Sequence, residues 1–189
     1  GGKKVEDKIG VIENLITKCD KLLVGGGMCF TFLKAKGYSV GNSIVDDNNI
    51  DFCKRMLNQY GDKIVLPVDI ITDKGARKVS DIKDNECGYD IGNETIKIFS
   101  DILKDAKRCI INGPMGVYED KKYSNGTKKI YTVLKDNKVK TLVGGGDSAS
   151  SVNNLGFKGV FYHVSTGGGA TLDYLSGKTL PGIYVIMEK

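Results

Sequence analysis

The residues whose types and spacing best suit chemistry lie in segment 142–151, where a short apolar run ends in glycines that lead into Asp147 and small hydroxyl residues. This pattern predicts a buried strand, a turn free of side chains, and a helix that starts at Ser148. The amides and dipole of a first helical turn attract an anion, and glycines let a phosphate approach the backbone. A carboxylate beside a phosphate repels it unless a cation lies between them, so Asp147 indicates a divalent metal, most simply Mg²⁺. The motif alone leaves open the alternative that Asp147 only caps the helix.

Other glycine-rich segments follow apolar runs in the same way. They are residues 25–27, 112–119 and 166–170. In parallel α/β sheets ligands bind outside the carboxyl ends of the strands, so we expect these segments to meet residues 144–148 at one edge. Tight turns explain any one cluster, whereas all of them together favour a ligand with several phosphates.

Two lysines near the start of the chain are candidates for contacting the same anion. Lys4 and Lys8 follow Gly1 and Gly2 at the entrance to an amphipathic helix, and residues at this spacing lie on one helix face. The alternative is that both are ordinary surface lysines. A glycine turn into a helix normally follows a strand, so we expect this sequence to be a piece cut from a longer chain.

The hydrophobic pattern predicts the elements that hold these residues in place. We expect helices over residues 8–19, 28–35, 50–60, 93–106, 126–135, 148–156 and 171–175, and strands over 21–24, 64–71, 108–111, 141–143, 160–164 and 182–187. Pro67 interrupts the strand over 64–71 and marks its end or an edge. Asn93 is expected to cap its helix. Residues 73–90 are charged and lack periodicity, so they are expected on the surface without an assigned secondary structure. The alternation predicts an α/β fold with a Rossmann-like parallel sheet and helices on both faces, in three α/β/α layers.

Composition narrows the class of protein. The 189 residues, 40% of them hydrophobic, suit one globular domain of ordinary size or slightly more. A net charge of +5 fits small anionic ligands such as nucleotides, and nucleic acid binding is not expected. The 5 cysteines and 1 histidine support neither a disulfide framework nor a zinc cluster. With no long apolar run and no signal peptide, we expect a cytoplasmic protein that does not enter a membrane.

Two commoner phosphate-binding motifs do not fit. The dinucleotide fingerprint at 144–149 contains Asp147 and lacks the later acid that would hold a ribose. The run Gly177-Lys178-Thr179 lacks the earlier glycine that a Walker A loop requires. His163 lies in an apolar strand pattern, where a packed core histidine is more common than a catalytic base.

Several runs together resemble the phosphoglycerate kinase family. They are NGPMGVYE at 112–119, VGGGDS at 143–148, STGGGA at 165–170 and LPG at 180–182. Their order is that of the family's C-terminal, nucleotide-binding domain, and the resemblance covers essentially the whole chain. Residues 1–189 are therefore interpreted as that domain, with the family's N-terminal phosphoglycerate-binding domain absent from this sequence.

The resemblance implies roles in phosphate transfer. Lys4 would neutralise the phosphoryl group during transfer, together with the amides of Gly168 and Gly169. Lys8 would hold the nucleotide phosphates, and Asp147 would bind Mg²⁺. No general base is needed when the acceptor is an ionised phosphate, because phosphoryl transfer depends on positioning and charge neutralisation.

The resemblance also implies a pocket for the whole nucleotide, in which Glu119 would bind the ribose hydroxyls. Its residues would be Lys4, Lys8, Gly26, Gly27, Gly88, Tyr89, Asn112, Gly113, Pro114, Gly116, Val117, Glu119, Gly145, Gly146, Asp147 and Ser148. The sequence departs from the family pattern in three places. Lys3 replaces an alanine, Tyr89 replaces a leucine that packs on the adenine, and segment 74–88 is shorter than usual.

The resemblance implies reversible phosphate transfer from 1,3-bisphosphoglycerate to MgADP, giving 3-phosphoglycerate and MgATP in a monomeric enzyme. The phosphoglycerate would bind through the absent N-terminal domain, so we expect this chain alone to bind ADP or ATP without turnover. The alternative is a noncatalytic module that only binds adenine nucleotides. The presence of Lys4, Lys8 and Asp147 favours the kinase, because such a module needs no transfer-site lysine.

Overall fold

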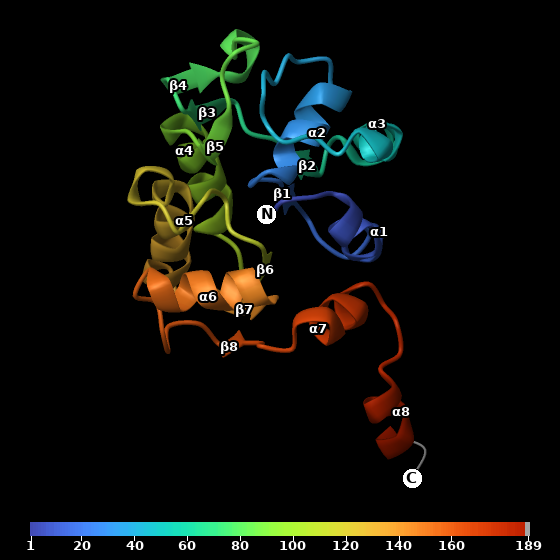
Figure 1. The fold of residues 1–189 in the computed structure, drawn as a ribbon. Helices are drawn as coiled ribbons and strands as arrows, with labels where there is room; N and C mark the ends of the chain where they lie inside the picture. The colour runs from blue at the N-terminus through green and yellow to red at the C-terminus, as the bar shows by residue number, and fades with distance from the viewer. Residues whose placement is uncertain (188–189) are drawn as a thin grey trace.

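The computed structural model describes residues 1–187 and confirms the predicted α/β fold, with parallel sheets flanked by helices (Figure 1). The helices are α1 (Ile9–Ile16), α2 (Met28–Ala35), α3 (Ile50–Tyr60), α4 (Asn93–Leu103), α5 (Asn125–Asp136), α6 (Gly146–Asn154), α7 (Gly168–Leu175) and α8 (Pro181–Met187). The strands are β1 (Leu22–Leu23), β2 (Ile64–Val65), β3 (Asp69–Thr72), β4 (Gly75–Lys78), β5 (Gly88–Ile91), β6 (Arg108–Asn112), β7 (Lys140–Gly144) and β8 (His163–Val164). Short 3₁₀ helices are η1 (Glu6–Lys8), η2 (Asp47–Asn49), η3 (Val79–Asp81) and η4 (Lys121–Tyr123).

The strands form two parallel sheets and one antiparallel sheet. β1 pairs with β2, and β6, β7 and β8 form a second parallel sheet in which Ile110 lies opposite Leu142. β3 lies between β4 and β5, antiparallel to both. Among the described residues β1 has one strand neighbour and so does β6, so each parallel sheet has an unpaired edge at that strand.

Two hydrophobic clusters make up the core. One joins α1, α2 and α3 around β1 and β2, and its members include the fully buried Phe32 and Cys53. The other joins α4 and α5 to β6 and β7, with Phe99, Tyr131 and Val143 at its centre. Because the helices bury their apolar stripes here, the carboxyl ends of β1, β6 and β7 are held in fixed positions.

The expected strand over residues 64–71, in which Pro67 marks an end or an edge, is two strands, and Pro67 lies between them. β2 ends at Val65, and β3 begins at Asp69 in a different sheet. Proline has no backbone N–H to donate to a ladder, so the pairing stops and the chain changes sheet. Most of the other expected elements differ from the observed ones only at their ends.

Segment 73–90 has a regular structure that its sequence pattern does not indicate. It contains β4, η3 and the start of β5. The Glu86 carboxylate is 3% exposed and accepts hydrogen bonds from Arg77 Nε at 2.8 and 3.1 Å. A buried charge pair here takes the place of the apolar alternation that would mark a strand.

Helix α4 is capped by a residue outside its own sequence, so the expectation that Asn93 caps it is wrong. The Asp69 carboxylate on β3 accepts hydrogen bonds from the backbone N–H groups of Glu94 at 3.0 Å and Thr95 at 2.7 Å. Asn93 is the exposed first residue of the helix, and the preceding Gly92 has no side chain to accept a bond.

Residues 182–187 form part of helix α8 instead of the expected strand. The helix begins at Pro181, whose fixed φ and missing N–H suit a first helical turn. Ile183 and Ile186 on α8 are 44% and 74% exposed.

His163, expected in the core, is exposed on the short edge strand β8. No helix within residues 1–187 is long and apolar enough to span a membrane.

Candidate functional site

The start of the chain lies between the loops that follow β1 and β6 (Figure 1). The backbone N–H of Gly2 donates to the carbonyl of Pro114 at 3.1 Å, and the carbonyl of Gly2 accepts from Met28 N–H at 3.0 Å. The two loops also touch directly, because Gly26 N–H donates to the carbonyl of Met115 at 2.9 Å. Segments far apart in the sequence therefore form one surface at the carboxyl ends of two parallel strands.

The loop after β7 joins this surface through two hydrogen bonds. Asn112 Nδ2 donates to the carbonyl of Gly144 at 3.1 Å, and Gly113 N–H donates to Ser148 Oγ at 2.6 Å. Ser148 is 1% exposed, so its hydroxyl is committed to holding the first turn of α6 against the loop after β6. The structure thus brings together three of the glycine-rich segments that the sequence singles out.

The fourth glycine-rich segment begins helix α7, which packs against α1. Asn14 Nδ2 on α1 donates to the carbonyl of Leu175 at 2.7 Å, and Gly10 lies so close to Ser176 that a Cβ on Gly10 would be 2.9 Å from the serine Cβ. Gly168 and Gly169 have open space around their Cα atoms. The contact between the two helices links the elements that carry Lys8 and the α7 glycines.

Close backbone approach explains glycine at the centre of the surface. At Gly26, φ is +65°, and a Cβ would lie 2.6 Å from Gly2 N. At Gly113, φ is +90°, and a Cβ would collide with the backbone of Gly1. A larger residue at either position would separate the loops, so these glycines are required for assembly of the surface.

Asp147 is exposed in the first turn of α6. The N-cap position of α6 is Gly145, and the helix has no side-chain cap hydrogen bond, so the cap interpretation gains no support. No cluster of three or more His, Cys, Asp and Glu side chains within residues 1–187 could hold a metal ion. One exposed carboxylate fits a Mg²⁺ ion whose remaining ligands are water and phosphate oxygens, the usual arrangement for this ion with nucleotides.

Lys8 is half-buried beside Gly2, where a Cβ would be 3.4 Å from the lysine Cε. Burial lowers the pKa of Lys8, and the negative charges of Asp7 and Asp147 oppose that effect. Lys4 is exposed at the entrance to η1.

Asn112 supplies an acceptor without a partner. Its Oδ1 atom is buried and, within the described chain, has no hydrogen bond, although its Nδ2 atom is bonded to Gly144. Buried polar atoms are nearly always hydrogen-bonded, so this oxygen is an exception among the described side chains.

The residues near β5 that were expected beside the base, Gly88 and Tyr89, have different surroundings. Tyr89 stacks on Tyr123, with ring centroids 4.6 Å apart and planes at 28°, so one of its faces is already covered. Its carbonyl accepts a hydrogen bond from Val117 N–H at 3.0 Å, which ties β5 to the loop after β6. Gly88 is buried, and its Cα faces the ring of Phe30. Gly88 therefore serves packing behind the surface.

The remaining expected residues lie on the exposed part of the same loops. Val117 is 41% exposed, and Glu119 is exposed beyond it. Gly116 packs against the Asp90 carboxylate, while Gly145 adopts φ +97° before α6 and Gly146 faces open space.

Two neighbouring side chains carry no signal in the sequence. Ile44 lies against Gly27, where a Cβ would be 2.8 Å from the isoleucine Cγ2, although its segment reads as a polar loop. Burial raises the pKa of the Tyr118 phenol, and the charges of Glu119 and Asp147 raise it further. Loop residues have no regular spacing of apolar positions, so the sequence predicts the surroundings of neither side chain.

Comparison with known proteins gives a consistent result. The family model described as phosphoglycerate kinase matches residues 1–178. Similar proteins include the phosphoglycerate kinase of Levilactobacillus brevis, 49% identical over 197 residues that cover 100% of this chain and 49% of that protein. Another is that of Corynebacterium kroppenstedtii, 48% identical, with 98% of this chain and 49% of that protein covered.

Solved structures agree. The phosphoglycerate kinase from Coxiella burnetii superposes with a TM-score of 0.96 at 33% identity, covering 100% of this chain and 51% of that one. The enzyme from Pyrococcus horikoshii gives a TM-score of 0.86 at 29% identity, covering 99% and 50%. The chain spans about half the length of the curated relatives it matches.

Proposed function

The chain belongs to the phosphoglycerate kinase family, and from that membership we propose that residues 1–189 are its C-terminal, nucleotide-binding domain. In the whole protein this domain would present MgADP or MgATP for reversible phosphate exchange with 1,3-bisphosphoglycerate and 3-phosphoglycerate. The single observation that carries the proposal is the convergence of the glycine-rich loops after β1, β6 and β7 on the start of the chain.

Each part of this surface has a role in the proposed function. Exposed amides at the start of α6 and in the α7 glycines Gly168 and Gly169 would bind phosphate oxygens, as helix N-termini do. Lys8 would hold the nucleotide phosphates, and Lys4 would neutralise charge on the phosphoryl group in transfer. Asp147 would hold Mg²⁺, which supplies charge neutralisation on the phosphates when it is bound.

The base and ribose would occupy the space beside the loop after β6. Gly26, Gly27 and Pro114 offer an apolar wall with little side-chain bulk, and Val117 is exposed next to them. Glu119, farther out on the loop, would bind the ribose hydroxyls.

One feature supports the assignment as one half of a larger enzyme. The apolar side chains of Ile183 and Ile186 are exposed on α8, which extends from the body of the domain (Figure 1). A second domain would cover them.

Titration calorimetry with ADP tests the proposal. We expect saturable binding that is tighter with Mg²⁺ than without it and is competed by ATP. Failure of ADP to bind at millimolar concentration would contradict it. A noncatalytic adenine-nucleotide module, the alternative, would bind ADP in the same way but would not need Lys4. In the whole protein, loss of phosphate transfer by Lys4→Met with MgADP affinity retained would favour the kinase.

A further inference from the structure

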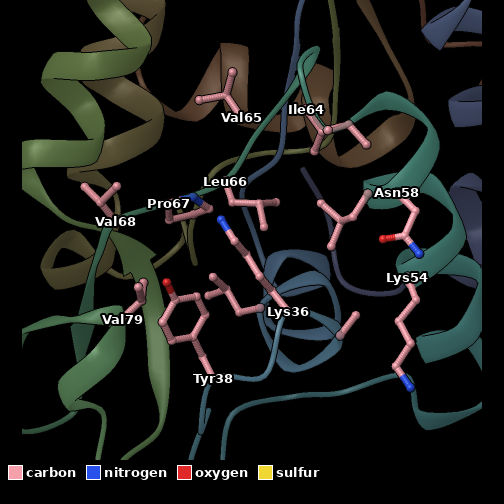
Figure 2. Close-up of a pocket in the computed structure, with 14 residues that line it drawn as sticks. Lys36, Tyr38, Lys54, Asn58, Ile64, Val65, Leu66, Pro67, Val68 and Val79 are labelled. Carbon is pink, nitrogen blue, oxygen red and sulfur yellow. The ribbon is translucent and has the colours of Figure 1, made fainter.

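A hollow of about 680 Å³ lies away from the glycine-rich loops, at the opposite end of α2 (Figure 2). The C-terminal end of α2, the middle of α3 and the segment 64–68 enclose it. This volume is in the range of pockets that hold organic molecules. The residues expected to bind nucleotide belong to other parts of the fold, so the hollow is separate from the proposed nucleotide site.

The walls of the hollow are mainly aliphatic. They include Leu33 from α2, Leu57 from α3 and the stretch from Ile64 to Val68. Leu33 and Ile64 are 1% and 7% exposed and form the floor of the hollow, while Leu57, Val65 and Leu66 are half-buried and carry more of the apolar surface that a ligand could cover. A ligand that fills the hollow would gain by removing apolar surface from water.

One cation and one hydroxyl are directed into this apolar space. Figure 2 shows the Lys36 amine reaching across the hollow toward Leu66 and Pro67, while the Tyr38 hydroxyl points to the side formed by Val68 and Val79. Within the described chain the Lys36 amine makes no hydrogen bond or ion pair. No acidic residue is among those that line the hollow.

The other lysine at the rim does not compete for an anion inside. Lys54 turns its amine away from the centre of the hollow and pairs with Asp51 at 3.5 Å. Both side chains are largely exposed, so this pair contributes little. Among the residues that line the hollow, the exposed Lys36 is therefore the cation that no acid neutralises, which matches a ligand with one negative charge.

An added peptide strand fits this place poorly. β2 is the outer strand of its sheet, but it is two residues long and is followed by Pro67, which cannot donate to a ladder. Short edge strands and proline are devices that prevent strand addition.

We propose that the hollow binds a small aliphatic monocarboxylate, with its carboxylate on the Lys36 amine and the Tyr38 hydroxyl and its alkyl chain against Leu33, Leu57 and Ile64. A charge-assisted hydrogen bond holds the head group, and the aliphatic walls hold the chain. This inference does not depend on the proposed function, because it concerns the far end of α2.

Decanoate, below its micelle concentration, is the probe, and 1-decanol is its uncharged match. We expect saturable decanoate binding to the 189-residue chain by titration calorimetry, about tenfold tighter than decanol, the scale of one charge-assisted hydrogen bond. Lys36→Met keeps an unbranched apolar side chain and removes the charge. It should lose this tenfold preference, whereas Lys129→Met, a change of an exposed lysine on α5, should keep it.

Methyl NMR locates the binding. Shifts at Leu33, Leu57 and Ile64 that persist in the presence of MgADP support the proposal. Equal affinity for decanoate and decanol, unchanged decanoate binding by Lys36→Met, or shifts confined to Ile183 and Ile186 on α8 would each overturn it. Competition by MgADP, or binding of an extended acidic peptide with no binding of decanoate, would overturn it as well.

Discussion

Asp147 has an isolated, exposed carboxylate, and its value near phosphate depends on a cation. Asp147→Asn should weaken binding of MgADP by about tenfold or more, the scale of a lost charge-assisted contact. The same change should leave metal-free ADP unaffected or bound slightly better, because a repulsive charge is removed. Calorimetry with and without Mg²⁺ measures both effects, and Asp105→Asn, an exposed acid after α4, is the matched control. Equal losses in the two titrations would contradict the assignment of Asp147 to the metal.

Asp90 is a second acid, and its buried environment leads to a testable prediction. Its carboxylate is 3% exposed and accepts hydrogen bonds from Gly126 N–H at 2.7 Å and Ile91 N–H at 2.9 Å. Burial raises the pKa of Asp90 to about 7, and these two bonds oppose the rise. Burial raises the pKa of the Cys29 thiol on α2 to about 12, and the charge of Asp90 contributes to that rise.

The raised pKa of Asp90 predicts a pH-dependent stability. The folded chain keeps a proton that the unfolded chain releases between about pH 4 and 7, so the free energy of unfolding falls as pH rises through this window. Urea unfolding should show a slope from this group of at most about 1.4 kcal/mol per pH unit. Asp90→Asn should remove that component, seen as a difference between the two pH profiles. Profiles that run parallel from pH 4 to 8 would contradict the assignment.

At the scale of elements, the start of α4 depends on strand β3. Asp69→Ala should lower the free energy of unfolding by about 1–2 kcal/mol, because two helix N–H groups lose their acceptor. Asn93→Ala, at the first position of the same helix, should change it by less than about 0.5 kcal/mol. Urea unfolding of both variants at one pH decides between the two caps. A larger effect at Asn93 would show that the cap is local after all.

The elements that the sequence predicts well are those with strong local signals. Helix Ile50–Tyr60 has its apolar residues at helical spacing and was expected with the observed bounds. Local signals fail where a partner elsewhere in the chain determines the structure. Glu86 is held by Arg77, and the first turn of α4 is capped by Asp69 on β3. They also fail at residues 182–187, where an apolar run fits a strand and a helix equally well.

The candidate site was predictable to a similar extent. Clusters of glycine after apolar runs identify the loops, because such turns need freedom that other residues lack. The contacts that set the shape of the site are not visible in the sequence. Ile44 touches Gly27 and Tyr89 stacks on Tyr123 only because the fold brings separate loops together. The predicted roles in binding nucleotide and metal stay predictions for the experiments above.

For the whole molecule, we expect nucleotide binding without phosphate transfer. The arginines that could clamp an acyl phosphate are dispersed, with Arg55 bonded to Glu13 at 3.0 Å and Arg77 bonded to Glu86. Transfer also requires two substrates to be aligned and water to be excluded, which closure around both would provide. A coupled assay of the chain with MgATP and 3-phosphoglycerate should stay at background, while ADP raises its melting temperature. Turnover on the order of 1–100 per second would show that the acyl phosphate site lies within these residues.

The position of Gly2 has a mechanical consequence. This residue is bonded to Pro114 on one side and to Met28 on the other, and its φ of +101° lets the chain turn sharply there. A pulling force applied at the amino end of the chain would therefore load these two backbone hydrogen bonds together, one to the loop after β6 and one to the first residue of α2. Because Met28 is also a buried member of the hydrophobic cluster around β1 and β2, the force would be transmitted directly to that cluster.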